Sequence, residues 1–266
     1  MIVYTNLFTL SNKEPSENRY IDMFWIWCHF LEKYGGLTTA DKVYVLVDSR
    51  TCDYMEKIIK FLPTKLNYCM IEYAPPRTVL EGILRRYTFL SFPFLDTSQA
   101  IMYLDLDILC VNSIQPLSTI EENSFYVSKE DKLLDLYHLG EVISAETYEF
   151  IKEKNLTDLE GYTAGWFLFK GEKINDLFTE IVMRCKNGKK NCITCEQPYF
   201  CYVVFDIQFR NTIPGIKIHI ADSEFFENNI SFQTKKKETI FLNYCGNVGD
   251  YNNHWLKLFG VLLSTS

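Results

Sequence analysis

Short apolar runs and longer amphipathic segments alternate along the N-terminal part of the chain. The apolar runs, which predict buried strands, are residues 2–7, 43–47, 65–73 and 101–109. The segments between them, whose apolar residues recur at helical spacing, are residues 20–34, 52–62 and 80–92. Strands that alternate with helices in this way are typical of a mostly parallel sheet flanked by helices. The sequence therefore predicts an α/β fold.

The remainder of the chain follows a less regular pattern. Strands are predicted at residues 124–128, 162–169, 216–221 and 239–242, and helices at residues 174–185 and 196–204. No internal repeat, low-complexity segment or linker interrupts the 266 residues. A chain of this length suffices for one large domain or one domain with an appended lobe.

The strand predicted at residues 101–109 carries two aspartates, Asp105 and Asp107, between apolar residues. Along a strand they would point to the same side, roughly 7 Å apart at their Cα atoms. Two carboxylates at the end of a buried strand repel each other and are costly to desolvate. Mn²⁺ or Mg²⁺ would relieve both effects, because these ions prefer oxygen ligands. Since ligands of open α/β sheets lie beyond the carboxyl ends of the strands, the stretch predicts a metal site that faces a ligand crevice. The alternative, a solvated turn or helix cap, agrees less well with the flanking apolar residues.

Charge, hydropathy and cysteine content narrow the classes of function. The formal net charge of -7 argues against a nucleic-acid partner held by a positive field. The chain has neither a signal-peptide pattern nor an apolar run of ~20 residues, so we expect no membrane span and no secretion. Nine scattered cysteines indicate free thiols in a reducing, cytoplasmic compartment. For the Cys192–Cys195 C-x-x-C pair, unpaired thiols are favoured over a zinc site.

Several short segments together resemble the GT-A nucleotide-sugar glycosyltransferases, in particular the retaining, glycogenin-like family 8. In chain order these segments are the first strand with Tyr20, Arg85-Arg86, Tyr103-Leu-Asp-Leu-Asp107, Tyr162-Thr-Ala-Gly165, Glu196-Gln197 and Asn243-Tyr-Cys-Gly246. The chain departs from the family pattern at three of them. Thr163 replaces an Asn, Glu196 replaces an Asp, and Asn243 stands where the family has its third metal ligand, a His. The Lys-Pro-Trp that completes the final family motif is absent, and His254-Trp255 is the nearest counterpart.

The resemblance implies one Rossmann-like GT-A domain over residues 1–266, with a nucleotide-binding half at 1–110 and an acceptor-side half at 111–266. It also implies a metal-dependent hexosyltransferase. Such an enzyme would move a hexose from a nucleoside-diphosphate sugar, for example UDP-glucose, to a hydroxyl of a glycan or protein, with retention. The sequence leaves a homodimer open.

The resemblance assigns roles to individual residues. Asp105, Asp107 and Asn243 would hold Mn²⁺ or Mg²⁺, with His254 as the alternative third ligand. Contacts to the nucleotide sugar are implied for Thr5, Leu7, Tyr20, Arg86, Asp105, Leu106, Asp107, Ala164, Gly165 and Gly246. Glu196 and Gln197 would join the two aspartates in catalysis, and Glu130 and Asp131 are further candidates for contacts to sugar hydroxyls. No nucleophile is identified, and front-face attack, the usual proposal for the retaining family, needs none.

Structural interpretations of the same residues stay open. Arg85 and Arg86 could form helix-surface ion pairs, Tyr20 could pack in the core, and Glu196 could merely start a helix. Two other functions also stay open. A haloacid-dehalogenase-type phosphatase uses the first Asp of an Asp-x-Asp as nucleophile, although that motif normally opens the chain. A non-catalytic sugar- or nucleotide-binding relative is suggested by Asn243.

Overall fold

The computed structural model describes residues 1–59, 65–188, 196–221, 225–228, 234–244 and 260. The chain forms two compact units, each made of segments that are distant in sequence. The first unit comprises Met1–Thr78, Ala100–Thr119 and Asp222–Ser266, and the second comprises Val79–Gln99 and Ile120–Ala221. The division into halves at residue 110 stays a prediction. Mostly parallel strands flanked by helices confirm the predicted α/β class.

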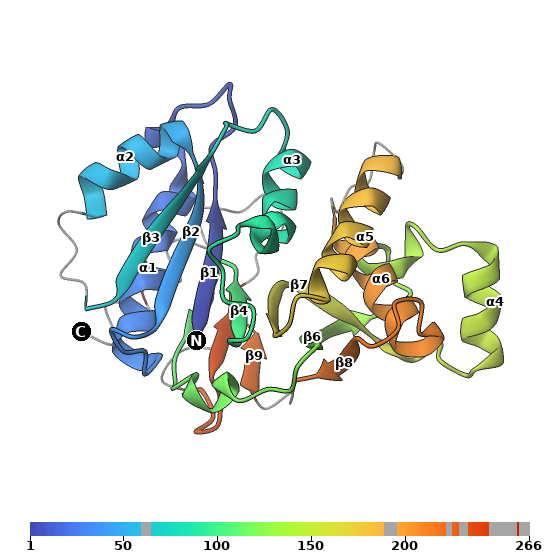
Figure 1. The fold of residues 1–266 in the computed structure, drawn as a ribbon. Helices are drawn as coiled ribbons and strands as arrows, with labels where there is room; N and C mark the ends of the chain where they lie inside the picture. The colour runs from blue at the N-terminus through green and yellow to red at the C-terminus, as the bar shows by residue number, and fades with distance from the viewer. Residues whose placement is uncertain (60–64, 189–195, 222–224, 229–233, 245–259, 261–266) are drawn as a thin grey trace. The chain divides into compact units, whose positions relative to one another are not determined.

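The first unit is built on four parallel strands in the order β3-β2-β1-β4. They are β1 (Ile2–Leu7), β2 (Lys42–Asp48), β3 (Asn67–Tyr73) and β4 (Ile101–Leu104). Helices α1 (Arg19–Tyr34) and α2 (Ser49–Ile59) run beside these strands, as Figure 1 shows. The Asn18 side chain caps α1 by accepting a hydrogen bond from the backbone N–H of Tyr20. The helix buries Phe24, Trp27 and Phe30.

A small second sheet completes the first unit. Its strands are β5 (Ile108–Cys110), β9 (Phe226–Asn228) and β10 (Phe241–Asn243), in the order β5-β10-β9. Strand β10 pairs antiparallel with β5 and parallel with β9. Two short 3₁₀ helices, η1 (Pro15–Glu17) and η3 (Gln115–Ser118), lie in loops of this unit. The C-terminal part of the chain is thereby paired with the segment that follows Asp107.

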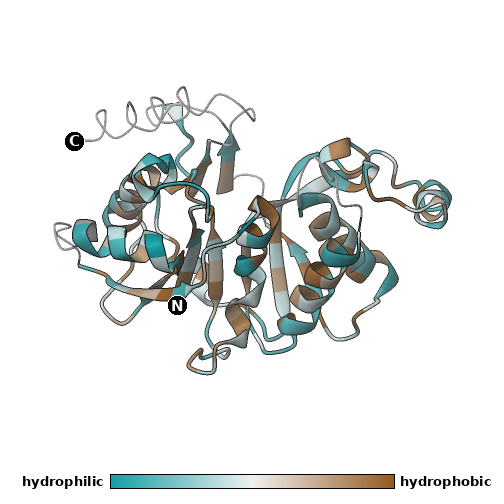
Figure 2. Ribbon diagram, turned by 90° about the horizontal axis from the view of Figure 1, so that it is seen from above, coloured by the Kyte–Doolittle hydropathy of each residue, from teal (hydrophilic) through white to brown (hydrophobic). Residues whose placement is uncertain are grey.

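The second unit contains three strands, β6 (Ser124–Lys132), β7 (Glu160–Phe169) and β8 (Lys217–Ile220). Strand β6 pairs antiparallel with β7 and parallel with β8. The helical segments are α3 (Val79–Ile83), η2 (Leu84–Ser91), the π-helical turn η4 (Leu136–Gly140), α4 (Ala145–Glu153), α5 (Ile174–Asn187) and α6 (Gln197–Arg210). Its core is a cluster of stacked and edge-on rings from η2, β6, β7, α5 and α6, formed by Tyr87, Phe125, Phe167, Phe169, Phe178 and Phe200. In Figure 2 the helices alternate between hydrophobic and hydrophilic positions, as expected for helices that bury one face.

The structure corrects the prediction of one strand over residues 101–109. Strand β4 ends at Leu104, β5 begins at Ile108, and Asp105, Leu106 and Asp107 form a turn between them. The Ile108 N–H donates to the Asp105 carbonyl at 3.1 Å and closes the turn. The alternating side-chain geometry of a strand therefore does not apply to the two aspartates. The apolar residues on both sides of the turn belong to different sheets, which is why the sequence reads as one continuous run.

Other predicted elements differ at their ends. The helix expected over residues 80–92 is a short α-helix continued by 3₁₀ turns, α3 and η2. Strand β6 runs four residues beyond its predicted end, through the polar stretch to Lys132. Strand β9 has no counterpart among the predicted elements, because three residues give no usable periodicity.

In the described part of the chain, no helix is both long and apolar enough to cross a membrane.

Candidate active site

The turn between β4 and β5 presents Asp105 and Asp107 at the carboxyl end of the parallel strand β4. Both residues are half-buried, and Leu106 between them is buried. The phenolic O–H of Tyr103 donates a hydrogen bond to Oδ1 of Asp105. Tyr103 is fully buried, and its ring lies edge-on to Tyr4, with the ring centroids 5.0 Å apart. The Asp105 carboxylate is therefore hydrogen-bonded to a fully buried tyrosine, Tyr103.

Strand β10 brings Asn243 alongside this turn. Asn243 lies opposite Ile108 in the antiparallel register, and the Tyr244 N–H donates to the Asp107 carbonyl at 2.9 Å. Asn243 is buried, with 6% of its surface exposed. The first unit thus brings together the three residues predicted as metal ligands, although 136 positions separate Asp107 from Asn243.

The chemistry of these residues fits a hard divalent cation. Asp105, Asp107 and Asn243 can offer only oxygen donors to a metal, which suits Mg²⁺ or Mn²⁺ better than softer ions. Among the described residues, no group of three or more His, Cys, Asp or Glu side chains could hold a metal ion. The predicted ligands, Asp105, Asp107 and Asn243, do not form such a group, because the third side chain is an amide. Gly246 and the alternative ligand His254 lie outside the described residues, as do Cys192 and Cys195.

The residues predicted to seat the nucleotide base come from β1 and the start of α1. Thr5 and Leu7 are buried in β1, at 0% and 1% exposure. The hydroxyl of Thr5 has no hydrogen-bond partner among the described residues. Tyr20, in the first turn of α1, is 42% exposed, so the alternative of core packing is wrong for this ring. The loop between Leu7 and Tyr20 is held by Asp48, whose carboxylate accepts hydrogen bonds from the backbone N–H groups of Thr9 and Thr51.

The two adjacent arginines have different environments. Arg85 is partly exposed and forms an ion pair with Glu81, one helical turn earlier, at 4.0 Å. Arg86 is buried, donates from Nη1 to the Ala164 carbonyl at 3.0 Å, and lies 3.5 Å from Oε1 of Glu196. Glu196 is itself only 5% exposed. The helix-surface interpretation therefore holds for Arg85 and is wrong for Arg86.

Gln197 makes hydrogen bonds to the backbone of β7. Its Oε1 accepts the Ala164 N–H at 2.9 Å, and its Nε2 donates to the Tyr162 carbonyl. One turn further along α6, the thiol of Cys201 donates to the same carbonyl at 3.0 Å. Burial raises the pKa of this thiol, so it stays protonated and able to donate. Together with Arg86, these bonds fix the Tyr162–Gly165 segment that resembles the family's motif.

Gly165, in the same segment, is half-buried and donates its N–H to Oγ1 of Thr163. Glu130 and Asp131 lie at a bulge of β6, where the register with β7 shifts between Glu130 and Lys132. Asp131 adopts a positive φ of 42° there. Bulges of this kind are common beside active sites, because they redirect side chains.

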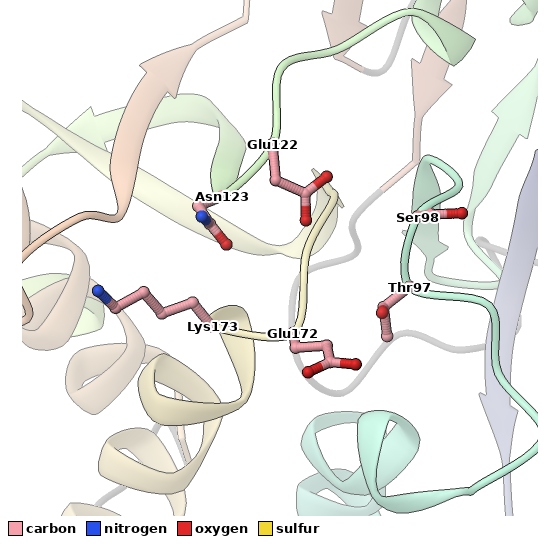
Figure 3. Close-up of a pocket in the computed structure, with 6 residues that line it drawn as sticks. All are labelled: Thr97, Ser98, Glu122, Asn123, Glu172 and Lys173. Atoms are coloured by element: carbon pink, nitrogen blue, oxygen red, sulfur yellow. The ribbon is translucent and has the colours of Figure 1, made fainter.

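A concave surface of the second unit lies elsewhere. A cavity of about 640 Å³ is lined by Thr97, Ser98, Glu122, Asn123, Glu172 and Lys173, as Figure 3 shows. Asn123 precedes β6 and Glu172 follows β7, whereas Glu130 is at the other end of β6. None of the predicted site residues lines this cavity, so the candidate site rests on its chemistry and not on the size of a hollow.

Sequence reasoning missed three residues that hold the candidate site residues in place. Tyr103 binds Asp105, Cys201 supports the carbonyl that Gln197 also contacts, and Asp48 fixes the loop after β1. One of these had a visible signal. Cys201 stands four residues after Gln197 in the predicted helix, which is the spacing of neighbours on one face, whereas Asp105 lies beyond the end of β4, so strand spacing does not link it to Tyr103.

Comparison with known proteins gives a consistent picture of the fold. No family model and no curated protein matches the sequence. Mouse xyloside xylosyltransferase 1, in its apo form, superposes with a TM-score of 0.57 at 10% identity, over 93% of this chain and 97% of that one. An active-site mutant of LgtC gives a TM-score of 0.57 at 15% identity, over 97% and 95% of the two chains. The bifunctional glycosyltransferase WbbM gives 0.58 at 10% identity, over 98% of this chain and 51% of that one.

At these identities the likeness is one of fold. The chain has the GT-A fold of nucleotide-sugar glycosyltransferases, as its sequence predicted.

Proposed function

We propose that the protein is a metal-dependent glycosyltransferase that moves a hexose from a uridine diphosphate sugar, such as UDP-glucose, to a hydroxyl of a glycan or protein. The observation that carries the proposal is the pairing of β10 with β5, which places Asn243 beside the Asp105–Asp107 turn at the carboxyl end of β4. Ligands of α/β folds bind beyond such strand ends. Oxygen donors gathered there are suited to a cation that binds a diphosphate.

In this proposal the first unit binds the metal and the nucleotide. Asp105 and Asp107 hold Mn²⁺ or Mg²⁺, with Asn243 as the third ligand. When bound, such an ion supplies Lewis-acid stabilisation of the departing diphosphate. Tyr20 offers an exposed ring for stacking on the base, and Thr5 and Leu7 offer β1 backbone and side-chain contacts. Leu106 and Gly246 are proposed as backbone contacts.

The second unit offers groups for the sugar. Glu196 carries a carboxylate suited to sugar hydroxyls, held at 3.5 Å by the Arg86 guanidinium. Arg86 is proposed to orient that carboxylate and to add positive charge for a phosphate. The amide of Gln197 is committed to the β7 backbone, so we propose that it fixes Ala164 and Gly165 where the sugar approaches. Retention is proposed to follow from front-face attack, which needs no enzymatic nucleophile.

The test is a panel of nucleotide sugars with Mn²⁺, scored for the nucleoside diphosphate released by slow hydrolysis or transfer. We expect turnover with a uridine diphosphate sugar and none with Asp107→Asn. The matched control is Asp53→Asn, an exposed aspartate of α2, which should keep full turnover. Sugar-nucleotide binding without any turnover would favour the non-catalytic alternative, and phosphate released from an aryl phosphate without a nucleotide would favour the phosphatase. Undiminished turnover of Asp107→Asn at saturating Mn²⁺ would refute the proposed metal site.

A further inference from the structure

Tyr103 is the third residue of β4 and lies entirely inside the first unit. It pairs in register with Tyr4 of β1, and the two rings meet edge-on at an interplanar angle of 60°. Because the strand fixes its backbone and Tyr4 fixes its ring, the hydroxyl has little freedom. That hydroxyl donates to Oδ1 of Asp105, on the half-buried turn that follows.

This hydrogen bond distinguishes the two oxygens of one carboxylate. Oδ1 of Asp105 accepts a hydrogen bond from the buried Tyr103 hydroxyl, so less of its electron density is available to a cation. Oδ2 does not take part in this bond. Hydrogen bonds to ligating carboxylates orient them, and losing such a partner typically weakens metal binding.

We propose that Tyr103 is a positioning residue that makes Asp105 a one-oxygen ligand and so sets the preference of the site for Mn²⁺ or Mg²⁺ over Ca²⁺. The inference rests on the proposed function, because it assumes the cation at Asp105 and Asp107. Its chemical basis is the difference between the ions. Ca²⁺ takes 6–8 oxygens and readily accepts both oxygens of a carboxylate, whereas Mg²⁺ requires near-octahedral geometry. A carboxylate restricted to one oxygen therefore favours the smaller ions.

The test uses Tyr103→Phe, which removes one oxygen and keeps the ring that packs on Tyr4. The Kd of Mn²⁺ is measured by electron paramagnetic resonance of the free ion in the presence of uridine diphosphate, and the Kd of Ca²⁺ by competition. We expect the Kd of Mn²⁺ to rise about 10- to 100-fold. The Kd of Ca²⁺ should rise less, so that the site discriminates less between the two ions. Tyr4→Phe, which removes a hydroxyl from the partner ring, should leave both constants unchanged.

A second measurement needs no metal. A double-mutant cycle of Tyr103→Phe and Asp105→Asn, read as melting temperatures in the presence of a chelator, reports whether hydroxyl and carboxylate interact. We expect the shifts to be non-additive. Additive shifts, or an unchanged ratio of the two Kd values in Tyr103→Phe, would overturn the inference and leave the proposed function standing. A wild-type protein that binds no Mn²⁺ with uridine diphosphate would overturn both.

Discussion

The buried pair of Arg86 and Glu196 makes a quantitative prediction about stability. Both side chains are almost completely buried, with 8% and 7% of their surfaces exposed, and 3.5 Å separates Nη1 from Oε1. Arg86→Met removes the positive charge but keeps an apolar stem of similar reach. It leaves the Glu196 carboxylate in a buried site without this partner and removes the bond to the Ala164 carbonyl. We therefore expect a large loss of stability.

The magnitude follows from burial. Removing one partner of a buried ion pair costs about 3–5 kcal/mol, because the remaining charge stays desolvated. For a unit of this size that corresponds to a fall in Tm of about 6–20 °C. Arg85→Met is the matched control, since Arg85 is the neighbouring residue and its ion pair with Glu81 is far less buried than that of Arg86 with Glu196. An exposed pair at this spacing contributes about 0.3–0.5 kcal/mol.

The assay is urea unfolding of both variants and of the double variant Arg86→Met/Glu196→Gln. Neutralising Glu196 should recover most of the loss, because it removes the buried charge that has lost its Arg86 partner, and Glu196 makes no side-chain capping bond that would be lost. A free energy of unfolding for Arg86→Met that equals that of Arg85→Met would refute the reasoning. So would a double variant that is less stable than Arg86→Met alone.

Three further predictions concern the first unit. Asn243→His should lower the Kd of Mn²⁺ and increase the preference for Mn²⁺ over Mg²⁺, since imidazole nitrogen is the stronger ligand for Mn²⁺. The Kd of each ion is measured by titration in the presence of uridine diphosphate, and an unchanged Kd would place β10 outside the metal site. Mn²⁺ and uridine diphosphate should raise the Tm together by more than the sum of their separate shifts, and strictly additive shifts would indicate separate sites. Burial alone would raise the pKa of Glu227, but hydrogen bonds from Thr239 and from the backbone of Lys236 lower it below the ordinary 4.5. Glu227→Gln should therefore cost about 1 kcal/mol of stability at pH 7. The loss of stability should disappear as the pH falls through the native pKa of Glu227, below 4.5, because the wild-type side chain then becomes neutral like that of Gln. A loss of stability that persists at pH 3 would show that it does not come from the ionised carboxylate.

The strands and helices from β1 to β3 could be predicted from the sequence because each has a clear hydrophobic pattern. Strands buried on both faces are continuous apolar runs, and the amphipathic helices between them have a clear period, so the elements from β1 to β3 were predicted correctly in kind. The same rule failed at residues 101–109, where two strands of different sheets adjoin and the turn between them is only three residues long. Apolar content reports burial, and burial does not reveal where a strand changes sheets.

The site could be predicted only in part, for a related reason. Asp105 and Asp107 are only two positions apart in sequence, and motif order pointed to Asn243, whose position next to the turn the structure supports. The role of Tyr103 depends on which way a hydroxyl turns, and the separate environments of Arg85 and Arg86 depend on how η2 packs. Contacts of this kind are made by tertiary packing, and a residue's neighbours in sequence do not specify them.

The pairing of β5 with β10 has a consequence for the protein as it is synthesised. Both aspartates of the turn are translated before the strand that borders them, which ends at Asn243. At about 5–20 residues per second, a ribosome takes on the order of ten seconds to travel from one to the other. During that interval the nascent chain carries both carboxylates without the strand that frames them. On the proposed function, a chain interrupted before β10 would hold the two aspartates yet bind metal poorly, so the ability to transfer sugar would arise only after β10 has been synthesised.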